Sequence, residues 1–431
     1  MPRISIENFG PVKKFEADVT DIMLLIGPQA SGKSTISKTI FIFKSLKNEI
    51  LNYIYSNHLK DSSPLLFYLK SKFLTYFGIQ PKRDLFSINY QYSSEKYIKF
   101  SGSRDKTIMI LSLTIAQELE LLITDIFNYR IIYQEQKQKF NSLEELRELE
   151  TSRRLQFNNF KLQIDQIFEE THSSVFIPAG RSLMSTLTEQ LQDIKNPDTL
   201  DYFTKSFVER INILKTYFTD DLQTLTQNQD IAKHLSDNLL KFLKTLVNKI
   251  LKGEYRFNAD IDKERIYFNY NQYVKLQYAS SGQQESVWIL LLIFRYILDK
   301  TSVFMVFEEP EAHLYPETQS DIVELIGLLA NLYNNQIIIT THSPYILSSF
   351  NNLLYADQVG KNKVGDEREA VESIVNSQSW IDPDRISAYF ISENGYESII
   401  DPELKLIQAE KIDSASSIIN EKFNDLFNLD D

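Results

Sequence analysis

The sequence contains no cysteine and no long hydrophobic run. The absence of cysteine excludes disulfide bonds, iron–sulfur clusters and cysteine-ligated zinc, and it is compatible with a reducing compartment. The longest apolar run, residues 287–298, carries Arg295 and is shorter than the roughly 20 apolar residues of a membrane span. The opening MPRISIENFG lacks the basic-then-apolar pattern of a secretory signal. We therefore expect a cytoplasmic protein without a membrane partner.

A basic excess is also missing, since 58 acidic and 46 basic residues give a net charge of −12. Residues 351–431 carry 17 acids and 7 bases, a net charge of −10, which leaves −2 for the first 350 residues. An obligate nucleic-acid-binding protein usually shows a strong basic excess, so only a local basic groove fits these numbers. The acidic segment is either a solvated surface or a surface that docks a basic partner.

Apolar residues make up 43% of the 431 residues, which is enough for a sizeable core. Residues 3–8 alternate between apolar and polar, and residues 22–26 (IMLLI) are continuously apolar, so both stretches are predicted strands. A helix is predicted at 35–46, and further strands are predicted at 86–92 and 97–100.

The middle of the chain is predicted to be helical in two blocks, residues 111–172 and 200–251, with a strand at 174–180 between them. In the second block, Leu239, Leu243, Leu246 and Ile250 share one helix face. The blocks are too short for a rod-like coiled-coil arm. We favour a helix bundle, with a short coiled-coil hairpin as the alternative.

From residue 255 the alternation returns and predicts an antiparallel meander. A helix at 283–298, a strand at 302–307, a helix at 317–332, a strand at 336–341 and a short helix after Pro344 follow. Strands that alternate with helices indicate a parallel sheet. The predicted α/β fold has a core built from residues 1–110 and 252–431, with an antiparallel β lobe. Residues 111–251 form a large α-helical insertion, which a core strand near 174–180 interrupts.

A complete phosphate-binding loop pattern, G-x-x-x-x-G-K-[ST], occupies residues 27–34 between the strand at 22–26 and the following helix. Backbone N–H groups of such a loop and the helix N-terminus bind phosphates. Lys33 is predicted to contact the β and γ phosphates of ATP, and the Ser34 hydroxyl to bind Mg²⁺. The predicted ATP-binding residues of this segment are Gly27, Pro28, Gln29, Ala30, Ser31, Gly32, Lys33, Ser34 and Thr35.

The apolar strand VFMVF ends in two carboxylates, Glu308 and Glu309, which is the pattern of a Walker B motif. We predict that Glu308 belongs to the Mg²⁺ site. Glu309 is the candidate general base that polarises the attacking water. The alternative is an acidic surface pair after an edge strand.

Two further segments complete the pattern. His342 follows the strand at 336–341, at the sheet edge where ligands bind, and it is predicted to contact the γ-phosphate or orient water. Ser280, Ser281, Gly282 and Gln283 open the helix before the Walker B strand. They form either a second anion site or a plain helix N-cap.

These four motifs in this order resemble the ABC-type ATPase heads of the SMC, RecF and OLD group. SSGQQE resembles the ABC signature, EEPEAHLYP the Walker B motif and D-loop, and THSP the switch histidine. EEPEAHLYP, the opening ISIENFGPVKKFE and the segment FIPAGRS are similar to the OLD-related ATPases, which include ATPase subunits of antiphage systems of the Septu and retron-associated kinds. The resemblance covers residues 1–45 and 255–350, with weaker support at 174–182 and 385–428.

The resemblance implies a P-loop NTPase of the ABC-ATPase-head type that forms a homodimer or higher homo-oligomer around ATP. Ser280, Ser281 and Gly282 would contact the γ-phosphate across the dimer, and residues 311–316, with His313, would line the interface. Arg181 would reach the nucleotide or the partner head, or would form a buried ion pair instead. OLD nucleases carry a Toprim nuclease domain, whereas only 81 residues follow Phe350 here. We therefore expect no nuclease site in this chain.

Two functions from different classes remain open. The first is a defence ATPase that senses infection and controls a separate effector, which we expect to be a nuclease. The second is a DNA-repair or chromosome-maintenance ATPase that acts directly on DNA. Salt-dependent DNA binding that stimulates hydrolysis would favour the second.

Overall fold

The computed structural model describes all residues except 79–84, 104–105, 140–141, 186–199, 228–234, 259–262, 270, 409–420, 423–425 and 427–431. Contacts divide the chain into two compact units. The first unit comprises Met1–Val19, Thr35–Ser174 and Glu393–Gly395, and the second comprises Thr20–Ser34, Val175–Ser392 and Tyr396–Asp431. Most of the acidic segment beyond residue 408 lies outside the described residues. The domain boundaries proposed from the sequence stay a prediction.

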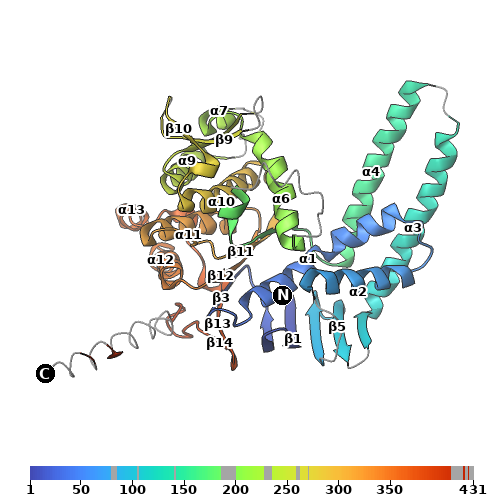
Figure 1. The fold of residues 1–431 in the computed structure, drawn as a ribbon, viewed down its shortest axis with the longest axis horizontal. Helices are drawn as coiled ribbons and strands as arrows, with labels where there is room; N and C mark the ends of the chain where they lie inside the picture. The colour runs from blue at the N-terminus through green and yellow to red at the C-terminus, as the bar shows by residue number, and fades with distance from the viewer. Residues whose placement is uncertain are drawn as a thin grey trace. The chain divides into compact units, whose positions relative to one another are not determined.

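An antiparallel sheet with the order β2-β1-β4-β5-β6 belongs to the first unit (Figure 1). Its strands are β1 (Arg3–Phe9), β2 (Val12–Asp18), β4 (Phe86–Gln91), β5 (Tyr97–Ser103) and β6 (Lys106–Leu111). Strands β1, β4 and β5 confirm predicted strands, whereas β2 and β6 were not predicted. In β2 the buried Val12 and Phe15 are three residues apart, and in β6 apolar side chains lie on both faces, so neither strand shows the alternation that indicates a half-buried strand.

Four helices complete the described part of the first unit: α1 (Lys33–Ser56), α2 (Ser63–Phe77), α3 (Leu113–Lys137) and α4 (Leu143–Ile167). Helix α1 begins with Lys33 and Ser34 of the second unit and continues into the first. It is longer than the helix predicted at 35–46, because the buried Ile50, Leu51 and Ile54 continue its apolar face. Helix α2 was not predicted.

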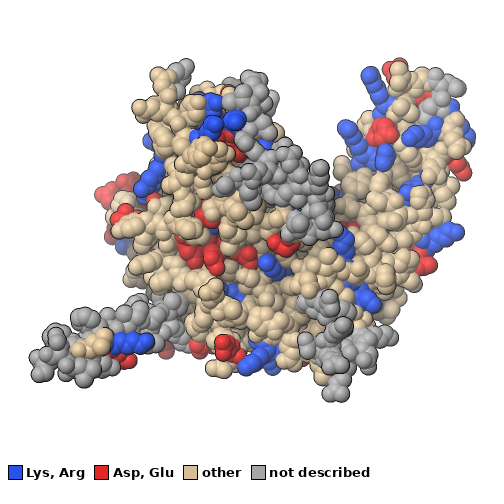
Figure 2. Space-filling view, viewed as in Figure 1, with Lys and Arg blue, Asp and Glu red and all other residues tan. Residues whose placement is uncertain are grey.

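Helices α3 and α4 run side by side in opposite directions and form a hairpin (Figure 1). Their contacts include the rings of Tyr129 and Phe160, 5.8 Å apart, and a 2.7 Å hydrogen bond that Tyr133 donates to Glu150. The helices at 200–251 belong to the second unit, so the predicted common bundle is wrong and the alternative hairpin describes the first block. Acidic and basic side chains are interspersed along this hairpin on the face shown in Figure 2.

A six-stranded sheet with the order β14-β13-β3-β12-β11-β7 forms the centre of the second unit. Its members are β14 (Gly395–Ser398), β13 (Ile386–Ser392), β3 (Ile22–Ile26), β12 (Gln336–Thr341), β11 (Val303–Glu308) and β7 (Ser173–Ile177). Strands β13, β3, β12 and β11 run parallel, which confirms the predicted parallel sheet. Every residue of β3 and of β11 is buried, as expected for strands covered on both faces.

The helices of this unit pack their apolar residues into one core with the sheet. Leu239, Leu243, Leu246 and Ile250 are buried on one face of their helix, as predicted. The helix after Pro344 continues to Gly360 and is longer than predicted. The helices are α6 (Tyr202–Leu214), α7 (Leu222–Gln227), α9 (Asp237–Leu251), α10 (Ser281–Leu298), α11 (Pro316–Asn331), α12 (Pro344–Gly360) and α13 (Asp366–Glu372).

The predicted antiparallel meander is present in the second unit as β8 (Glu254–Asn258), β9 (Lys263–Tyr267) and β10 (Tyr273–Lys275). None of the described helices is long and apolar enough to cross a membrane.

Candidate nucleotide-binding site

The register of the parallel sheet brings three predicted motifs to one edge. Ile26 of β3 lies opposite Thr341 of β12, and Thr340 lies opposite Glu308 of β11. The residues that follow these positions therefore emerge together at the carboxyl ends of the strands, where ligands bind in open α/β sheets. They are the phosphate-binding loop, the second acid Glu309 and the histidine His342.

The loop after β3 has the backbone conformation that its glycines allow. Gly27 has φ 151°, and a Cβ at this position would lie 2.0 Å from the carbonyl oxygen of Ile391 in β13. Gly32 has φ 107° and Ala30 has φ 60°. Pro28, Gln29 and Ala30 are exposed, and α1 begins at Lys33 with Ser34 and Thr35 in its first turn. The loop is therefore tightly seated against the sheet, with its tip open.

Lys33 folds back on its own loop. Its Nζ donates hydrogen bonds to the carbonyl oxygens of Gly27 and Pro28 at 2.9 and 2.7 Å. Burial lowers the pKa of the ammonium group to about 8, although the charges of Glu309 and Glu311 act to raise it. A nearby polyanion would restore the charged form, because an opposite charge favours it.

The two acids at the carboxyl end of β11, Glu308 and Glu309, have different surroundings. Glu308 is 6% exposed, and its Oε1 has no hydrogen-bond partner among the residues that the structure describes. Glu309 has φ 46°, and its N–H donates to the carbonyl of Thr340 at 2.8 Å. Its side chain is about half exposed and lies 3.3 Å from Nε2 of His342, measured at Oε1. One carboxylate is thus enclosed, and the other faces solvent beside an imidazole.

Glu311 is a third acid at this edge, and sequence reasoning placed it only in a dimer interface. Its Oε1 accepts hydrogen bonds from the Thr341 hydroxyl at 2.6 Å and from the backbone N–H of His342 at 2.9 Å. Burial raises the pKa of Glu311. This carboxylate fixes the segment that carries His342. Its position two residues after Glu309 was the only sign of this contact in the sequence.

The turn before α10 caps the amino end of that helix. The Ser280 hydroxyl accepts from the N–H of Gln283, whose side chain in turn accepts from the N–H of Ser280. A Cβ at Gly282 would lie 3.0 Å from the carbonyl oxygen of His313 in the same chain. Ser281 is exposed. The turn therefore forms the helix N-cap that was one of the two alternatives. The anion-binding role of Ser280, Ser281, Gly282 and Gln283 stays a prediction.

Arg181 is fully buried and forms the ion pair that was its structural alternative. Its Nε lies 3.2 Å from Oε2 of Glu285, and its terminal nitrogens donate to the backbone carbonyls of Glu308 and Glu309. This position does not support the predicted direct contact with nucleotide or with a partner head. Local patterning could not reveal the contacts of Arg181 with Glu285, Glu308 and Glu309, because these residues are more than 100 positions away in the sequence.

The side chains at this edge fit a magnesium nucleotide. The Ser31 hydroxyl and Glu308 Oε1 are buried, and neither has a partner among the described residues. A hydroxyl and loop N–H groups suit phosphate oxygens, and a carboxylate oxygen suits Mg²⁺. Among the described residues, no cluster of three or more His, Asp or Glu side chains forms an all-protein metal site.

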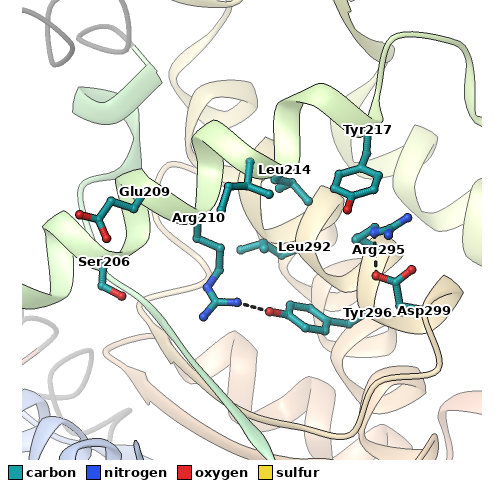
Figure 3. A pocket seen from close by; sticks show the side chains of 10 residues that line it. Ser206, Glu209, Arg210, Leu214, Tyr217, Leu292, Arg295, Tyr296 and Asp299 are labelled. Atoms are coloured by element: carbon teal, nitrogen blue, oxygen red, sulfur yellow. Dashed lines mark hydrogen bonds and ion pairs between the residues drawn. The ribbon is translucent and has the colours of Figure 1, made fainter. Parts of the chain in front are cut away.

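A separate cavity of about 360 Å³ lies against the carboxyl-terminal half of α10 (Figure 3). Several of its polar groups pair within the cavity. Arg295 lies 2.7 Å from Asp299 and stacks on the ring of Tyr217, and Arg210 donates to the hydroxyl of Tyr296. None of the predicted site residues lines this cavity.

The parallel strand order and the glycine-bearing loop between β3 and α1 define an α/β P-loop fold. Comparison with protein families gives the more specific assignment. The chain belongs to the AAA ATPase domain family, whose model matches residues 1–347. No curated protein matches the chain.

Three of the solved structures that match the chain are the following. An SMC head bound to the C-winged helix domain of ScpA has 10% identity, coverage of 92% of this chain and 96% of that chain, and a TM-score of 0.41. The SMC head domain from Thermotoga maritima has 11% identity, coverage of 80% and 90%, and a TM-score of 0.35. The recombination mediator RecF with ATPrS has 11% identity, coverage of 92% and 97%, and a TM-score of 0.36. The fold assignment rests on the strand order and the loop geometry above.

Proposed function

We propose that the protein is a Mg²⁺-dependent ATPase that hydrolyses ATP at the carboxyl edge of the β3–β12–β11 sheet. The observation that supports this proposal is the convergence of Lys33, Glu308, Glu309 and His342 at that edge. The loop N–H groups, Ser31 and Lys33 bind the phosphates. Ser34 and Glu308 hold Mg²⁺, which supplies positive charge that stabilises the transition state.

Hydrolysis in this proposal uses Glu309 as general base. Its half-exposed carboxylate accepts a proton from water as the water oxygen attacks the γ-phosphorus and the bond to the β–γ bridging oxygen breaks. ADP leaves with the bond electrons, and inorganic phosphate is the other product. His342, which lies against Glu309, orients the water or donates to a γ-phosphate oxygen.

The first test replaces Lys33 with alanine in the purified protein. Lys33 is the cation predicted to contact the β and γ phosphates, so we expect loss of ATP binding or of hydrolysis. Fluorescent-nucleotide titration and phosphate release measure the two steps separately, with Mg²⁺ and with EDTA. Unchanged turnover by Lys33→Ala would refute the assignment of the loop.

The resemblance of EEPEAHLYP and FIPAGRS to OLD-related ATPases supports a finer proposal. Here the protein dimerises around ATP through Ser280, Ser281 and Gly282 in trans, and it controls a separate effector nuclease in a cytoplasmic antiphage system. Copurification from the native host tests the partner. Strong salt-dependent stimulation of hydrolysis by DNA, with no copurifying effector, would instead support the repair-type function.

A further inference from the structure

One buried arginine joins three segments of the second unit that are distant in the sequence. Arg181 follows the turn after β7, and its guanidinium is 0% exposed. It donates from Nε to the carbonyl of Glu285 in α10 at 2.9 Å. Its terminal nitrogens donate to the carbonyls of Glu308 and Glu309 at 2.7 and 2.8 Å, and one of them also donates to Pro178 at 2.8 Å. A single planar group therefore contacts α10 and both acids of the candidate site.

Glu285 completes the connection from the other side. Its two carboxylate oxygens accept from the backbone N–H groups of Arg181 and Ser182, each at 3.0 Å. It lies one helical turn after Ser281, on the helix that Ser280 caps. The Ser185 hydroxyl adds a second link, because it donates to the carbonyl of Gln284 at 3.0 Å and accepts from the Trp288 indole at 2.9 Å. The first turns of α10 are thus fixed to the segment that carries Arg181.

The carbonyls that Arg181 holds are those that orient the general base. Glu309 has a left-handed φ of 46°, a conformation that a non-glycine residue keeps only where its surroundings hold it. The contacts at Glu308 O and Glu309 O restrain the peptides on either side of the Glu309 Cα. An ion pair with Glu285 alone would need neither contact. The rigid fork of a guanidinium suits several acceptors at once, which a lysine ammonium would not match.

We propose that Arg181 is a positioning residue that couples the first turns of α10 to Glu309, so that the turn containing Ser281 and the hydrolytic acid move together. This inference rests on the proposed function. It makes Arg181 necessary for the rate of hydrolysis rather than for nucleotide affinity, since none of its described contacts is to residues 27–34 and it meets Glu308 at the backbone carbonyl, not at the carboxylate that would hold Mg²⁺. It also connects the residues of the α10 turn to Glu309 of the same chain, through Glu285 and Arg181.

The test compares Arg181→Met, Glu285→Gln and the double variant. Arg181→Met alone leaves the Glu285 carboxylate buried and unpaired, which destabilises the fold. The double variant removes both charges and keeps an acceptor for Ser182, so it should regain stability. The carbonyls of Glu308 and Glu309 still lack their donor, so kcat should stay about 10²-fold lower, the usual cost of a misplaced catalytic group. The Kd for ATP and ATP-driven dimerisation should stay as in the wild type.

The matched control is a second arginine of the same unit. Arg385 pairs with Asp21 at 2.8 Å and donates to the carbonyl of Ala330 at 2.7 Å, near the amino ends of the strands and away from the candidate site. The double variant Arg385→Met, Asp21→Asn removes the same kinds of contact. It should leave kcat unchanged once the protein is folded.

The outcomes separate the two levels of the proposal. A folded Arg181→Met, Glu285→Gln protein with wild-type kcat would overturn the positioning role, and so would a parallel loss of ATP affinity. If the double variant does not fold, Arg181→Lys gives the same test, because it keeps the charge but cannot hold both carbonyls. Its kcat should fall at an unchanged Kd, and a wild-type kcat would overturn the role. Absence of hydrolysis by the wild-type protein would refute the proposed function itself, and normal turnover by Glu309→Gln would refute the assignment of Glu309 as its general base.

Discussion

Two groups of buried polar side chains in this protein differ in whether they have partners. At the base of the α3–α4 hairpin, Lys44 pairs with Glu170, Lys47 pairs with Asp165, and His172 contacts Glu170. At the carboxyl edge of the central sheet, Ser31 Oγ, Glu308 Oε1 and Glu311 Oε2 are buried without a partner among the described residues. The first group therefore stabilises the fold, whereas the second has polar groups available for a ligand.

The pKa values of the two groups follow the same division. Burial acts to raise the pKa of Glu170, but the hydrogen bond with His172 and the charge of Lys44 outweigh it and lower the pKa to about 2. Burial lowers the pKa of Lys33 to about 8, and the nearby acids do not offset it. The folded protein thus favours the charged form of Glu170 and disfavours the charged form of Lys33.

The largest expected effect is at the sheet edge. Glu309→Gln keeps the shape of the side chain and removes the base, so we expect a loss of about 10²–10⁴ in the rate of hydrolysis. ATP binding should persist, and the variant should accumulate as an ATP-bound dimer, as measured by phosphate release and light scattering. The exposed acid Glu367 provides the control, and its change to Gln should leave the rate unchanged. Normal turnover by Glu309→Gln together with a slow Glu308→Gln would show that the two roles are exchanged.

A substitution of Glu170 tests whether the group of paired charges stabilises the fold. Glu170→Gln leaves Lys44 buried without its charged partner, so we expect the free energy of unfolding to fall by about 3–5 kcal/mol. The neighbouring Glu169 is about half exposed. Glu169→Gln should therefore change the free energy of unfolding by about 0.5 kcal/mol or less. Urea unfolding at pH 7 measures both. Equal stabilities for the two variants would contradict the stabilising role of the cluster.

The lowered pKa of Glu170 predicts how the free energy of unfolding changes at acid pH. Because the pKa of Glu170 is lowered on folding, its contribution is present above the pKa of the unfolded chain, about 4.3, and is lost as the pH falls towards about 2. The stability difference between wild type and Glu170→Gln should shrink over this range. A difference that is constant with pH would contradict this assignment.

A mixing experiment asks whether the open site is completed by a second chain. Lys33→Ala and Ser281→Arg are each expected to be inactive, and a mixed dimer would contain one intact pair of loop and signature. Partial recovery of hydrolysis on mixing is expected. Ser281 is preferred to Gly282, because a side chain at Gly282 would press on His313 of the same chain. No recovery, with mixed dimers shown to form, would refute the trans contact.

The smallest expected effect is the pH dependence of ATP binding. Above pH 8 the Lys33 amine is largely neutral in the free protein, and bound phosphates favour its charged form, so binding should take up a proton. Affinity should then fall by up to about tenfold per pH unit above 8. Titration calorimetry at pH 7 and 9, in two buffers of different ionisation enthalpy, measures this. Lys33→Arg, which stays charged, should lose the dependence.

The features that are local or strictly periodic can be predicted from the amino-acid sequence. The loop at residues 27–34, strands β3, β11 and β12, and the parallel sheet were predictable, because continuous apolar runs end in recognisable polar motifs. Strand β2 and helix α2 are not predicted by periodicity, and the prediction that the two helical blocks form one bundle is wrong. The place of these elements in the fold depends on which surfaces they cover, and periodicity alone does not reveal those surfaces.

The partners of the buried polar groups, in contrast, depend on the tertiary structure. Arg181 meets Glu285, Glu308 and Glu309 across more than 100 positions of sequence, and Glu311 meets the backbone of His342 across 31. Such contacts follow from strand order and register, in which distant segments become neighbours. A motif specifies which chemical groups are available, and the packing of the sheet specifies how they are oriented.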